Sequence, residues 1–188
     1  LMADGNIYEC DESGVLKRST EEAEAIEPYN VANLIVDSKV TTIRYCQFAS
    51  CHSLKSVRFE GKTLDSIDDT AFHDCRNLTS VDFSGMTIGY LGELAFGTCV
   101  SLTGLTLNEP VTIQAMGYGC FSYTGLTTTS LDKIKGLTSL PSGVFNQCYD
   151  LVETGLDKNT TIQSIGSEAF AYCYGLTDTG LGANTSVT

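Results

Sequence analysis

The sequence of 188 residues has no tryptophan, only three prolines and two histidines, and far fewer basic than acidic residues. Eleven Lys and Arg stand against 23 Asp and Glu, which gives a formal net charge of -12. A nucleic acid would therefore meet repulsion, with no basic stripe to offset it. No apolar run approaches the ~18 residues of a membrane-spanning helix. We expect a folded protein with no nucleic-acid partner and no membrane span.

Sequence motifs of catalysis and metal binding are also missing. No nucleophile elbow, zinc-protease, phosphate-loop or dinucleotide fingerprint occurs, and no two cysteines have the Cys-x-x-Cys spacing of metal and redox sites. His52 and His73 occupy different positions of the repeat described below, so surface histidines explain them better than a zinc site. The adjacent Asp68 and Asp69 suit helix-capping positions better than an acid–base pair. We expect neither an enzyme nor a bound cofactor.

The sequence instead repeats itself at a regular interval. Phenylalanine recurs at separations of 24, 24, 25, 24 and 25 residues. A fixed period of this length is typical of a solenoid, in which each repeat buries its apolar side chains only against its neighbours. The recurring residues are Phe48, Phe72, Phe96, Phe121, Phe145 and Phe170.

Each repeat has three parts. Apolar residues stand eight and five positions before each Phe, as do Leu64 and Ile67, and we expect them to be inward anchors on the convex side. A mostly small residue just before Phe suits one helical turn packed closely over the core. The following segment alternates with period two, as in Val57 and Phe59, which is typical of a half-buried strand. Successive strands should form one parallel sheet joined by right-handed crossovers.

Small, weakly polar residues recur inside the predicted core. A position repeated in every turn stacks on itself, which is the behaviour of a buried small hydrophobe. Because neighbouring strands lie roughly 4.7–4.9 Å apart, free thiols and disulfides between adjacent cysteines are both open. This position holds Cys51, Cys75, Cys99, Thr124, Cys148 and Cys173. Later strands also carry an inward threonine, whose hydroxyl needs a partner, at Thr129, Thr154 and Thr179.

Residues 1–39 lack the full repeat and are expected to form an N-terminal cap. Residues 7–10 and 15–18 flank a turn-like Asp-Glu-Ser-Gly run, which predicts a short hairpin. A capping-box pattern followed by proline predicts a short helix over residues 19–28. The spacing of the next residues predicts a degenerate first repeat.

Residues 40–188 hold about six repeats, and the last predicted strand lies close to Thr188. An uncovered last strand offers unpaired backbone groups and exposed leucines. We therefore expect either that the native chain continues past Thr188 or that an end-to-end contact forms there.

The best-preserved repeat is TIQSIGSEAFAYCYGLTDTGL, with weaker copies such as SIDDTAFHDCRNLTSVDF and YLGELAFGTCVSLTGLTL. These runs resemble the BspA-like class of leucine-rich repeats, whose core reads Ile-Gly-x-x-Ala-Phe-x-x-Cys-x-x-Leu. The resemblance covers residues 29–188. It implies an α/β repeat solenoid, a right-handed superhelix with a parallel β-sheet on the concave side and short helical turns on the convex side. It also implies a secreted or cell-surface protein used for adhesion or partner recognition, without a catalytic motif.

The outward strand positions are the first candidate binding surface, because a sheet presents them as rows of side chains on a rigid backing. Small polar residues there suit a hydrogen-bonding partner, although any solvated sheet face displays similar residues. The candidates are Ser56, Arg58, Ser80, Asp82, Thr106, Asn108, Thr128, Ser130, Glu153, Asp157 and Asp178.

A strip of tyrosines along one edge is the second candidate. These residues stand two or four positions after Phe in the late repeats, and tyrosine provides a large contact area with a polar tip. The alternative is that the rings shield turn backbone between repeats, and burial of the rings in the turns would exclude the strip. The residues are Tyr123, Tyr149, Tyr172 and Tyr174.

Two functions follow. The first is a non-enzymatic module that recognises a protein or glycan partner through the concave face or the tyrosine edge. The second is a structural spacer, or stalk, with no ligand of its own. A binding module should lose affinity when Arg58, Asp82, Thr106 or Glu153 is changed while its melting temperature barely moves, and a spacer should not.

Overall fold

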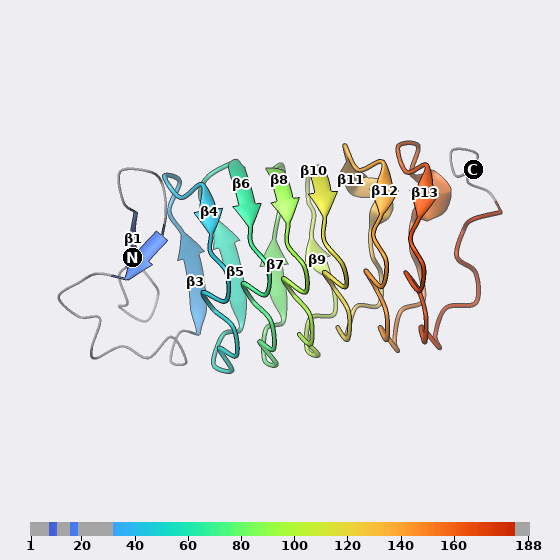
Figure 1. The fold of residues 1–188 in the computed structure, drawn as a ribbon, viewed down its shortest axis with the longest axis horizontal. Coiled ribbons are helices and arrows are strands. Elements are labelled where there is room, and N and C mark those ends of the chain that lie inside the picture. Colours follow the sequence, from blue (N-terminus) through green and yellow to red (C-terminus); the bar gives the residue numbers. More distant parts are fainter. Residues whose placement is uncertain (1–7, 11–15, 19–31, 183–188) are drawn as a thin grey trace.

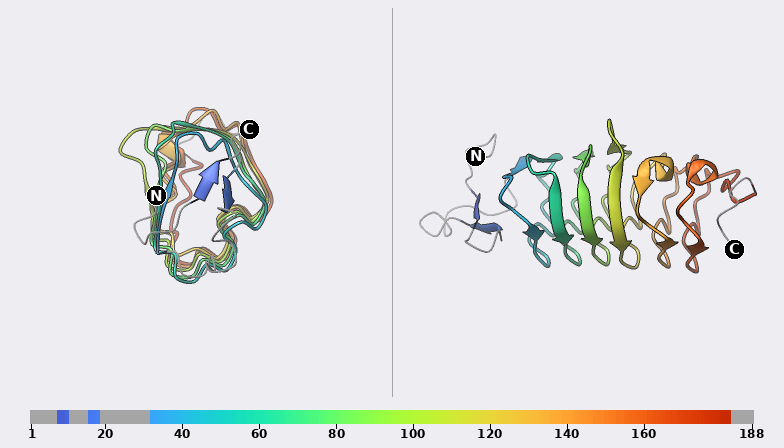
Figure 2. Two further views of the ribbon diagram at one scale, coloured as in Figure 1. Left: turned by 90° about the vertical axis from the view of Figure 1, so that its left-hand side faces the viewer. Right: turned by 90° about the horizontal axis from the view of Figure 1, so that it is seen from above.

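The computed structural model of the chain describes residues 8–10, 16–18 and 32–182. Residues 32–182 wind into a β-solenoid whose successive turns stand side by side along one axis (Figure 1). Seen along that axis, the turns superimpose on one closed outline (Figure 2). The solenoid predicted from the period is therefore present. No helix among the described residues is long and apolar enough to cross a membrane.

The first sheet consists of the predicted strands. They pair in parallel in the order β3-β5-β7-β9, and the register places residues one repeat apart opposite each other, as with Arg58 and Asp82. Alternate side chains are buried, such as Val57 and Phe59, while Arg58 between them is exposed. The strands are β3 (Asn33–Val36), β5 (Ser56–Phe59), β7 (Ser80–Asp82) and β9 (Leu105–Thr106).

A second parallel sheet, which the sequence analysis missed, carries the residues predicted as convex anchors. Leu64 and Ile67 are buried as expected, but they lie on a strand, with two less buried residues between them. Figure 1 shows these strands running opposite to those of the first sheet. The sheet order is β11-β10-β8-β6-β4. Its strands are β4 (Thr42–Ile43), β6 (Thr63–Ile67), β8 (Thr87–Leu91), β10 (Val111–Met116) and β11 (Ile134–Lys135).

The remaining elements are short. In the late repeats β12 (Ser139–Leu140) pairs in parallel with β13 (Ser164–Ile165). Two 3₁₀ helices, η2 (Leu131–Lys133) and η3 (Leu156–Lys158), contact each other in neighbouring repeats. At the N-terminal end β1 (Tyr8–Cys10) pairs antiparallel with β2 (Leu16–Arg18), where the sequence predicts a hairpin. The helix predicted over residues 19–28 and the end-to-end contact predicted at Thr188 fall outside the described residues.

The turn segment around each Phe is not the helical turn expected on the convex side. The residues two before and two after Phe72, Thr70 and Asp74, have φ of 55° and 60°, in the left-handed region. The Phe72 N–H donates to the carbonyl oxygen of Ala95 in the next repeat at 2.8 Å, whereas an α-helix would direct it within its own turn. Alternate N–H groups thus bond to the neighbouring repeat, whereas those between them bond three residues back, as the His73 N–H does to the carbonyl oxygen of Thr70 at 3.0 Å. This backbone joins repeats and closes short turns without forming an α-helix.

The same left-handed pair recurs in every described repeat that contains the Phe. Glycine occupies two of these positions, and the others hold ordinary side chains whose cost in this region the surrounding ladder must offset. The residues two before Phe are Cys46, Thr70, Leu94, Gly119, Gly143 and Glu168. The residues two after Phe are Ser50, Asp74, Thr98, Tyr123, Gln147 and Tyr172.

The core between the sheets is organised around a column of phenylalanine rings. Phe72 is fully buried, and its ring stacks on Phe48 at a centroid distance of 5.2 Å and on Phe96 at 5.1 Å. The stack continues through Phe121 and Phe145 to Phe170. A single position of the linear repeat has thus become one continuous column.

A second column holds the cysteines. Four of these thiols donate to the carbonyl oxygen of the phenylalanine one repeat earlier, for example Cys75 Sγ to Phe48 O at 3.1 Å; the other three are Cys99, Cys148 and Cys173. The Thr124 hydroxyl takes the same place in the column and lies 3.1 Å from Cys148 Sγ. All cysteines in residues 32–182 are free thiols. Burial and the neighbouring Cys148 raise the pKa of Cys173 to about 11, so this thiol stays protonated near neutral pH.

The inward threonines also find the partners that their burial requires. The Thr129 hydroxyl donates to the carbonyl oxygen of Thr154 at 2.5 Å. The Thr154 hydroxyl donates in turn to the carbonyl oxygen of Thr179 at 2.8 Å. These bonds join three successive repeats where the aliphatic residues of earlier strands are missing.

Candidate functional site

The predicted face of the first sheet forms rows of side chains one repeat apart. One row contains Arg58, Asp82 and Thr106, which lie opposite one another on β5, β7 and β9. In another row an isolated parallel bridge pairs Thr128 with Glu153. The exposed members of the predicted set are Arg58, Asn108, Glu153, Asp157 and Asp178, and the others, Ser56, Ser80, Asp82, Thr106, Thr128 and Ser130, are half-buried.

Many polar groups of this face bond to near neighbours. The Ser56 hydroxyl donates to Asn33 Oδ1 at 2.7 Å, and Asp82 Oδ1 accepts from the Ser84 N–H at 2.9 Å. Four predicted residues are on neither a strand nor a bridge. Ser130 precedes η2 in a left-handed conformation and Asp157 lies within η3. Asn108 and Asp178 also lie outside the strands. The face therefore loses its regular sheet geometry in the late repeats.

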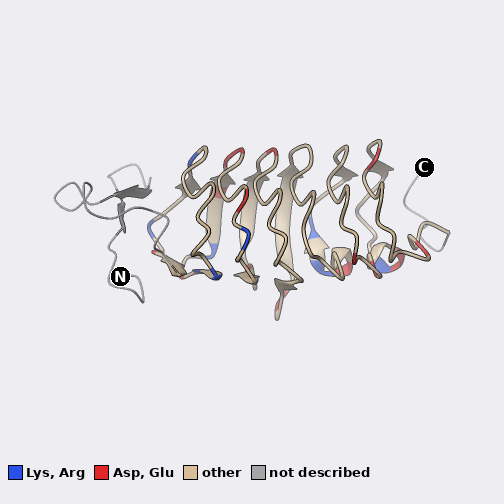
Figure 3. Cartoon of the chain, turned by 90° about the horizontal axis from the view of Figure 1, so that it is seen from below, with Lys and Arg blue, Asp and Glu red and all other residues tan. Residues whose placement is uncertain are grey.

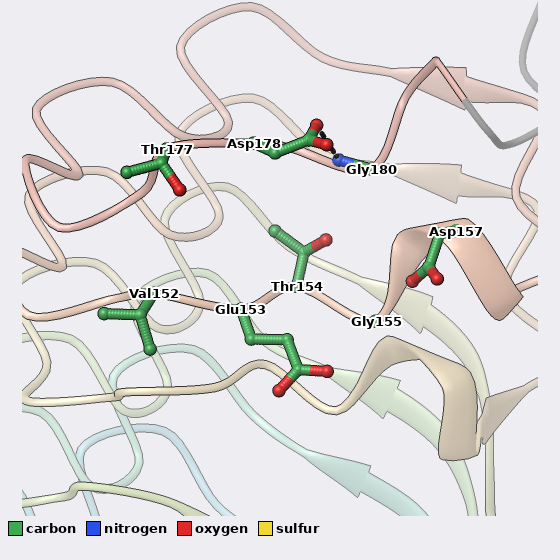
Figure 4. A pocket seen from close by; sticks show the side chains of 8 residues that line it. All are labelled: Val152, Glu153, Thr154, Gly155, Asp157, Thr177, Asp178 and Gly180. Carbon is green, nitrogen blue, oxygen red and sulfur yellow. Dashed lines mark hydrogen bonds between the residues drawn. The ribbon is translucent and has the colours of Figure 1, made fainter.

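A shallow hollow of about 310 Å³ lies at this late end, next to three of the predicted carboxylates (Figure 4). Figure 4 shows the side chains of Glu153, Asp157 and Asp178 pointing in different directions. Asp178 Oδ1 already accepts a hydrogen bond from the Gly180 N–H at 2.8 Å. Within residues 32–182, no three His, Cys, Asp or Glu side chains come together in a way that could hold a metal ion.

The turn segments around the successive Phe residues form another face of the solenoid, which we call the turn face. It carries a larger groove of about 440 Å³ that the sequence did not predict. Turn segments of five successive repeats contribute to it. All of its lining residues stand two or three positions before a Phe, or one or two after it. They are His73, Leu94, Thr98, Tyr118, Ser122, Tyr123, Asn146, Gln147, Glu168 and Tyr172.

The predicted tyrosine strip lies on this turn face, and its four rings are exposed rather than buried in the turns, with exposed fractions of 44–75%. Tyr123 and Tyr172 line the groove. Tyr149 stacks on Tyr174 at a centroid distance of 5.8 Å, and its edge meets Tyr123 at 6.4 Å. The Tyr149 hydroxyl bonds to Oε1 of Gln147, which connects the strip to the groove.

A fifth tyrosine of the turn face escaped the sequence analysis. Tyr118 stands three residues before Phe121, is 52% exposed and lines the groove. Its ring lies against Gly143, where an added Cβ would come within 3.2 Å of the ring and where φ is +62°. Because Gly143 has no side chain, the ring of Tyr118 can pack against its backbone. A comparison of the positions two and three before Phe across the repeats would have revealed Gly143 and Tyr118, respectively.

The repeat pattern also matches a known family. A family model described as BspA type leucine rich repeat region matches six copies, over residues 22–152 and 86–187. The chain belongs to the BspA-type leucine-rich repeat family. The family resemblance predicted from the sequence is therefore confirmed.

Two solved structures are similar to this BspA-type chain. The leucine rich repeat protein of T. pallidum, TpLRR, has 27% identity and a TM-score of 0.62, over 78% of this chain and 65% of that one. A leucine rich cell surface protein of Faecalibacterium prausnitzii A2-165 has 23% identity and a TM-score of 0.50, over 78% of this chain and 38% of that one. The latter likeness shows the fold alone. A search of curated proteins returned no significant match.

In the early BspA-type repeats, the two columns that carry tyrosines later hold a charged cluster. His52 Nε2 lies 3.2 Å from Asp74 Oδ2, and Arg76 Nε lies 2.7 Å from Asp74 Oδ1. Burial raises the pKa of Asp74, but the hydrogen bonds from Arg76 and His52 outweigh it and the pKa is lowered. The turn face thus changes from charged to aromatic along the solenoid. Elsewhere in the described residues, Lys and Arg are distributed over several turns (Figure 3).

Proposed function

We propose that this chain is a non-enzymatic recognition module that binds a protein or glycan partner through its turn face. The observation that carries the proposal is the strip formed by Tyr123, Tyr149, Tyr172 and Tyr174, exposed by 44–75% and in ring contact with one another. Single exposed apolar side chains are ordinary, whereas contiguous ones mark interaction sites. Tyrosine is also enriched among the residues that dominate binding energy.

The sheet face is the weaker binding surface. Its rows are polar, and several of its groups already bond locally, as do Ser56 and Asp82. No residue of the predicted sheet-face set is aromatic, so this face offers a partner hydrogen-bonding groups without a large ring contact area. A cell-surface location is part of the proposal, because the family resemblance implies it.

The experiment compares the two faces directly. The folded chain is immobilised and exposed to extracts, and the captured partner is quantified for a turn-face variant (Tyr149→Ala with Tyr174→Ala) and a sheet-face variant (Arg58→Ala with Asp82→Ala). We expect the turn-face variant to lose capture while its melting temperature barely moves, and the sheet-face variant to keep it. Equal specific capture by the parent and both variants would contradict a binding site on the turn face, and the absence of specific capture by any of them would favour the spacer.

A further inference from the structure

We propose that the groove on the turn face binds a neutral saccharide. The inference rests on the proposed recognition function and names the class of ligand for the same surface. The proposal is based on one arrangement: three exposed tyrosine rings, two carboxamides and one carboxylate line the same groove of about 440 Å³. That volume falls within the range of roughly 300–1,000 Å³ found for small-molecule sites.

The aromatic part of the groove consists of Tyr118, Tyr123 and Tyr172, with exposed fractions of 52%, 44% and 56%. One face of a pyranose ring presents C–H groups, and an exposed aromatic ring can stack against that face while its hydroxyl remains available for hydrogen bonds. Leu94 is the one aliphatic side chain among the described lining residues. An apolar peptide side chain would therefore make few aliphatic contacts in the groove, whereas a sugar ring could stack on the flat tyrosine rings.

The polar part suits the hydroxyl groups of a sugar. A carboxamide offers a donor and an acceptor in one plane, and a carboxylate accepts from two hydroxyls. Asn146 Nδ2 lies 3.4 Å from Glu168 Oε2, so these two groups stand side by side. Gln147 Oε1 accepts a hydrogen bond from the hydroxyl of Tyr149. Side chains with both kinds of hydrogen-bonding group thus line the same groove as the aromatic rings.

The charge of the groove decides between neutral and anionic sugars. Its described lining includes the carboxylate of Glu168 and the imidazole of His73 but neither Lys nor Arg. A sialylated or uronic sugar would place a second carboxylate near Glu168 without a guanidinium or ammonium partner. A neutral saccharide meets no such repulsion.

The backbone that carries these side chains is fixed by the fold. Tyr123, Gln147 and Tyr172 have φ of 56–60°. The N–H groups of Tyr123 and Gln147 donate to carbonyl oxygens of the next repeat at 2.9 and 2.8 Å. Because the turn is held by its neighbour before any ligand arrives, little ordering cost remains for binding.

The test is a titration of the whole chain with lactose, maltose, cellobiose, N,N′-diacetylchitobiose and 3′-sialyllactose, monitored by calorimetry and by amide chemical shifts. We expect at least one neutral disaccharide to bind, with shifts concentrated at Tyr123, Gln147 and Tyr172. Tyr172→Asn, which removes the ring but keeps a residue that tolerates left-handed backbone, should weaken binding by on the order of tenfold or more. Glu168→Gln tests the carboxylate, and Tyr45→Ala, a 69% exposed tyrosine outside the groove, is the matched control.

Binding only of the sialylated sugar, or equal weakening by Tyr45→Ala, would overturn the inference. So would the absence of any sugar binding, and the capture experiment then separates two cases. Capture of a protein that depends on Tyr149 and Tyr174 would leave the recognition function standing without the saccharide. Absence of both activities would remove both proposals.

Discussion

Phe72 and Phe96 are 24 residues apart in the chain, yet their rings stack with centroids 5.1 Å apart and planes within 8°. This contact shows how the period of the sequence becomes structure. Every position of the repeat forms a column, so the surface of the molecule is read across repeats rather than along the chain. The tyrosine strip and the groove are both products of that stacking.

The first prediction concerns the middle of the phenylalanine column. Phe96→Ala removes a fully buried ring that contacts Phe72, Phe121 and Phe83, and should lower the free energy of unfolding by about 3–5 kcal/mol. Phe170→Ala, at a ring that is only half-buried, should cost clearly less. Urea unfolding followed by circular dichroism measures both. Equal losses at the two positions would show that the middle of the column carries no special weight.

The second prediction concerns thiol reactivity. Cys46 is exposed, whereas Cys120 and Cys148 are buried and burial raises their pKa. Because the thiolate is the nucleophile, iodoacetamide should label Cys46 at neutral pH while the buried thiols react only after denaturation. Peptide mapping by mass spectrometry identifies the labelled residues. Rapid native labelling of Cys148 would contradict the buried column.

The third prediction is a loss of stability at high pH. An unfolded thiol has a pKa of about 8.5, and Cys173 in the fold has a pKa of about 11. The folded state therefore holds its proton longer, so this contribution is complete below about pH 8.5 and is lost as the pH rises towards 11. The free energy of unfolding should fall over this window, by up to about 1.4 kcal/mol per pH unit for each such thiol. Cys173→Ala should flatten the slope, and an unchanged slope would exclude Cys173 as its source.

The fourth prediction concerns the inward threonines. The Thr154 hydroxyl donates to the carbonyl oxygen of Thr179 and accepts from the Leu156 N–H at 3.0 Å. Thr154→Val keeps the shape but removes both bonds, and should cost about 1–3 kcal/mol in chemical unfolding. The exposed Thr177→Val is the control and should be nearly silent. A Thr154→Val protein as stable as the parent would show that the hydroxyl is dispensable.

Much of the fold was predictable because an apolar residue that recurs at the same position of every repeat indicates that this position is buried. The stack of Phe72 and Phe96 follows from the period, and the burial of Val57 and Phe59 follows from alternation along β5. The second sheet was missed for a physical reason. Its inward residues Leu64 and Ile67 are three positions apart, a spacing that suits a helix as well as an irregular strand.

The turn segments were mispredicted because their deciding feature is backbone conformation. Residue types as different as Thr70, Leu94 and Glu168 occupy the same left-handed position, so glycine, the usual signal, is mostly missing. The hydrogen bonds that hold them there come from the next repeat and cannot be read from one segment. The tyrosine strip was visible in the sequence as a column, whereas the groove needed Tyr118 and Glu168 from different positions of different repeats.

The central claim is that stacking joins side chains from different repeats into one turn face, and cysteine crosslinking tests it most directly. In a Cys10→Ser, Cys46→Ser background, Tyr149 and Tyr174 are both replaced by cysteine. Tyr149 and Tyr174 are equivalent positions of neighbouring repeats, and their rings stack. Neighbouring strands lie roughly 4.7–4.9 Å apart, which is within bridging range, so mild oxidation should form a disulfide. The pair Tyr123→Cys and Tyr174→Cys, two repeats apart and hence separated by about 10 Å, should stay reduced. A crosslink in the second pair, or none in the first, would contradict the account.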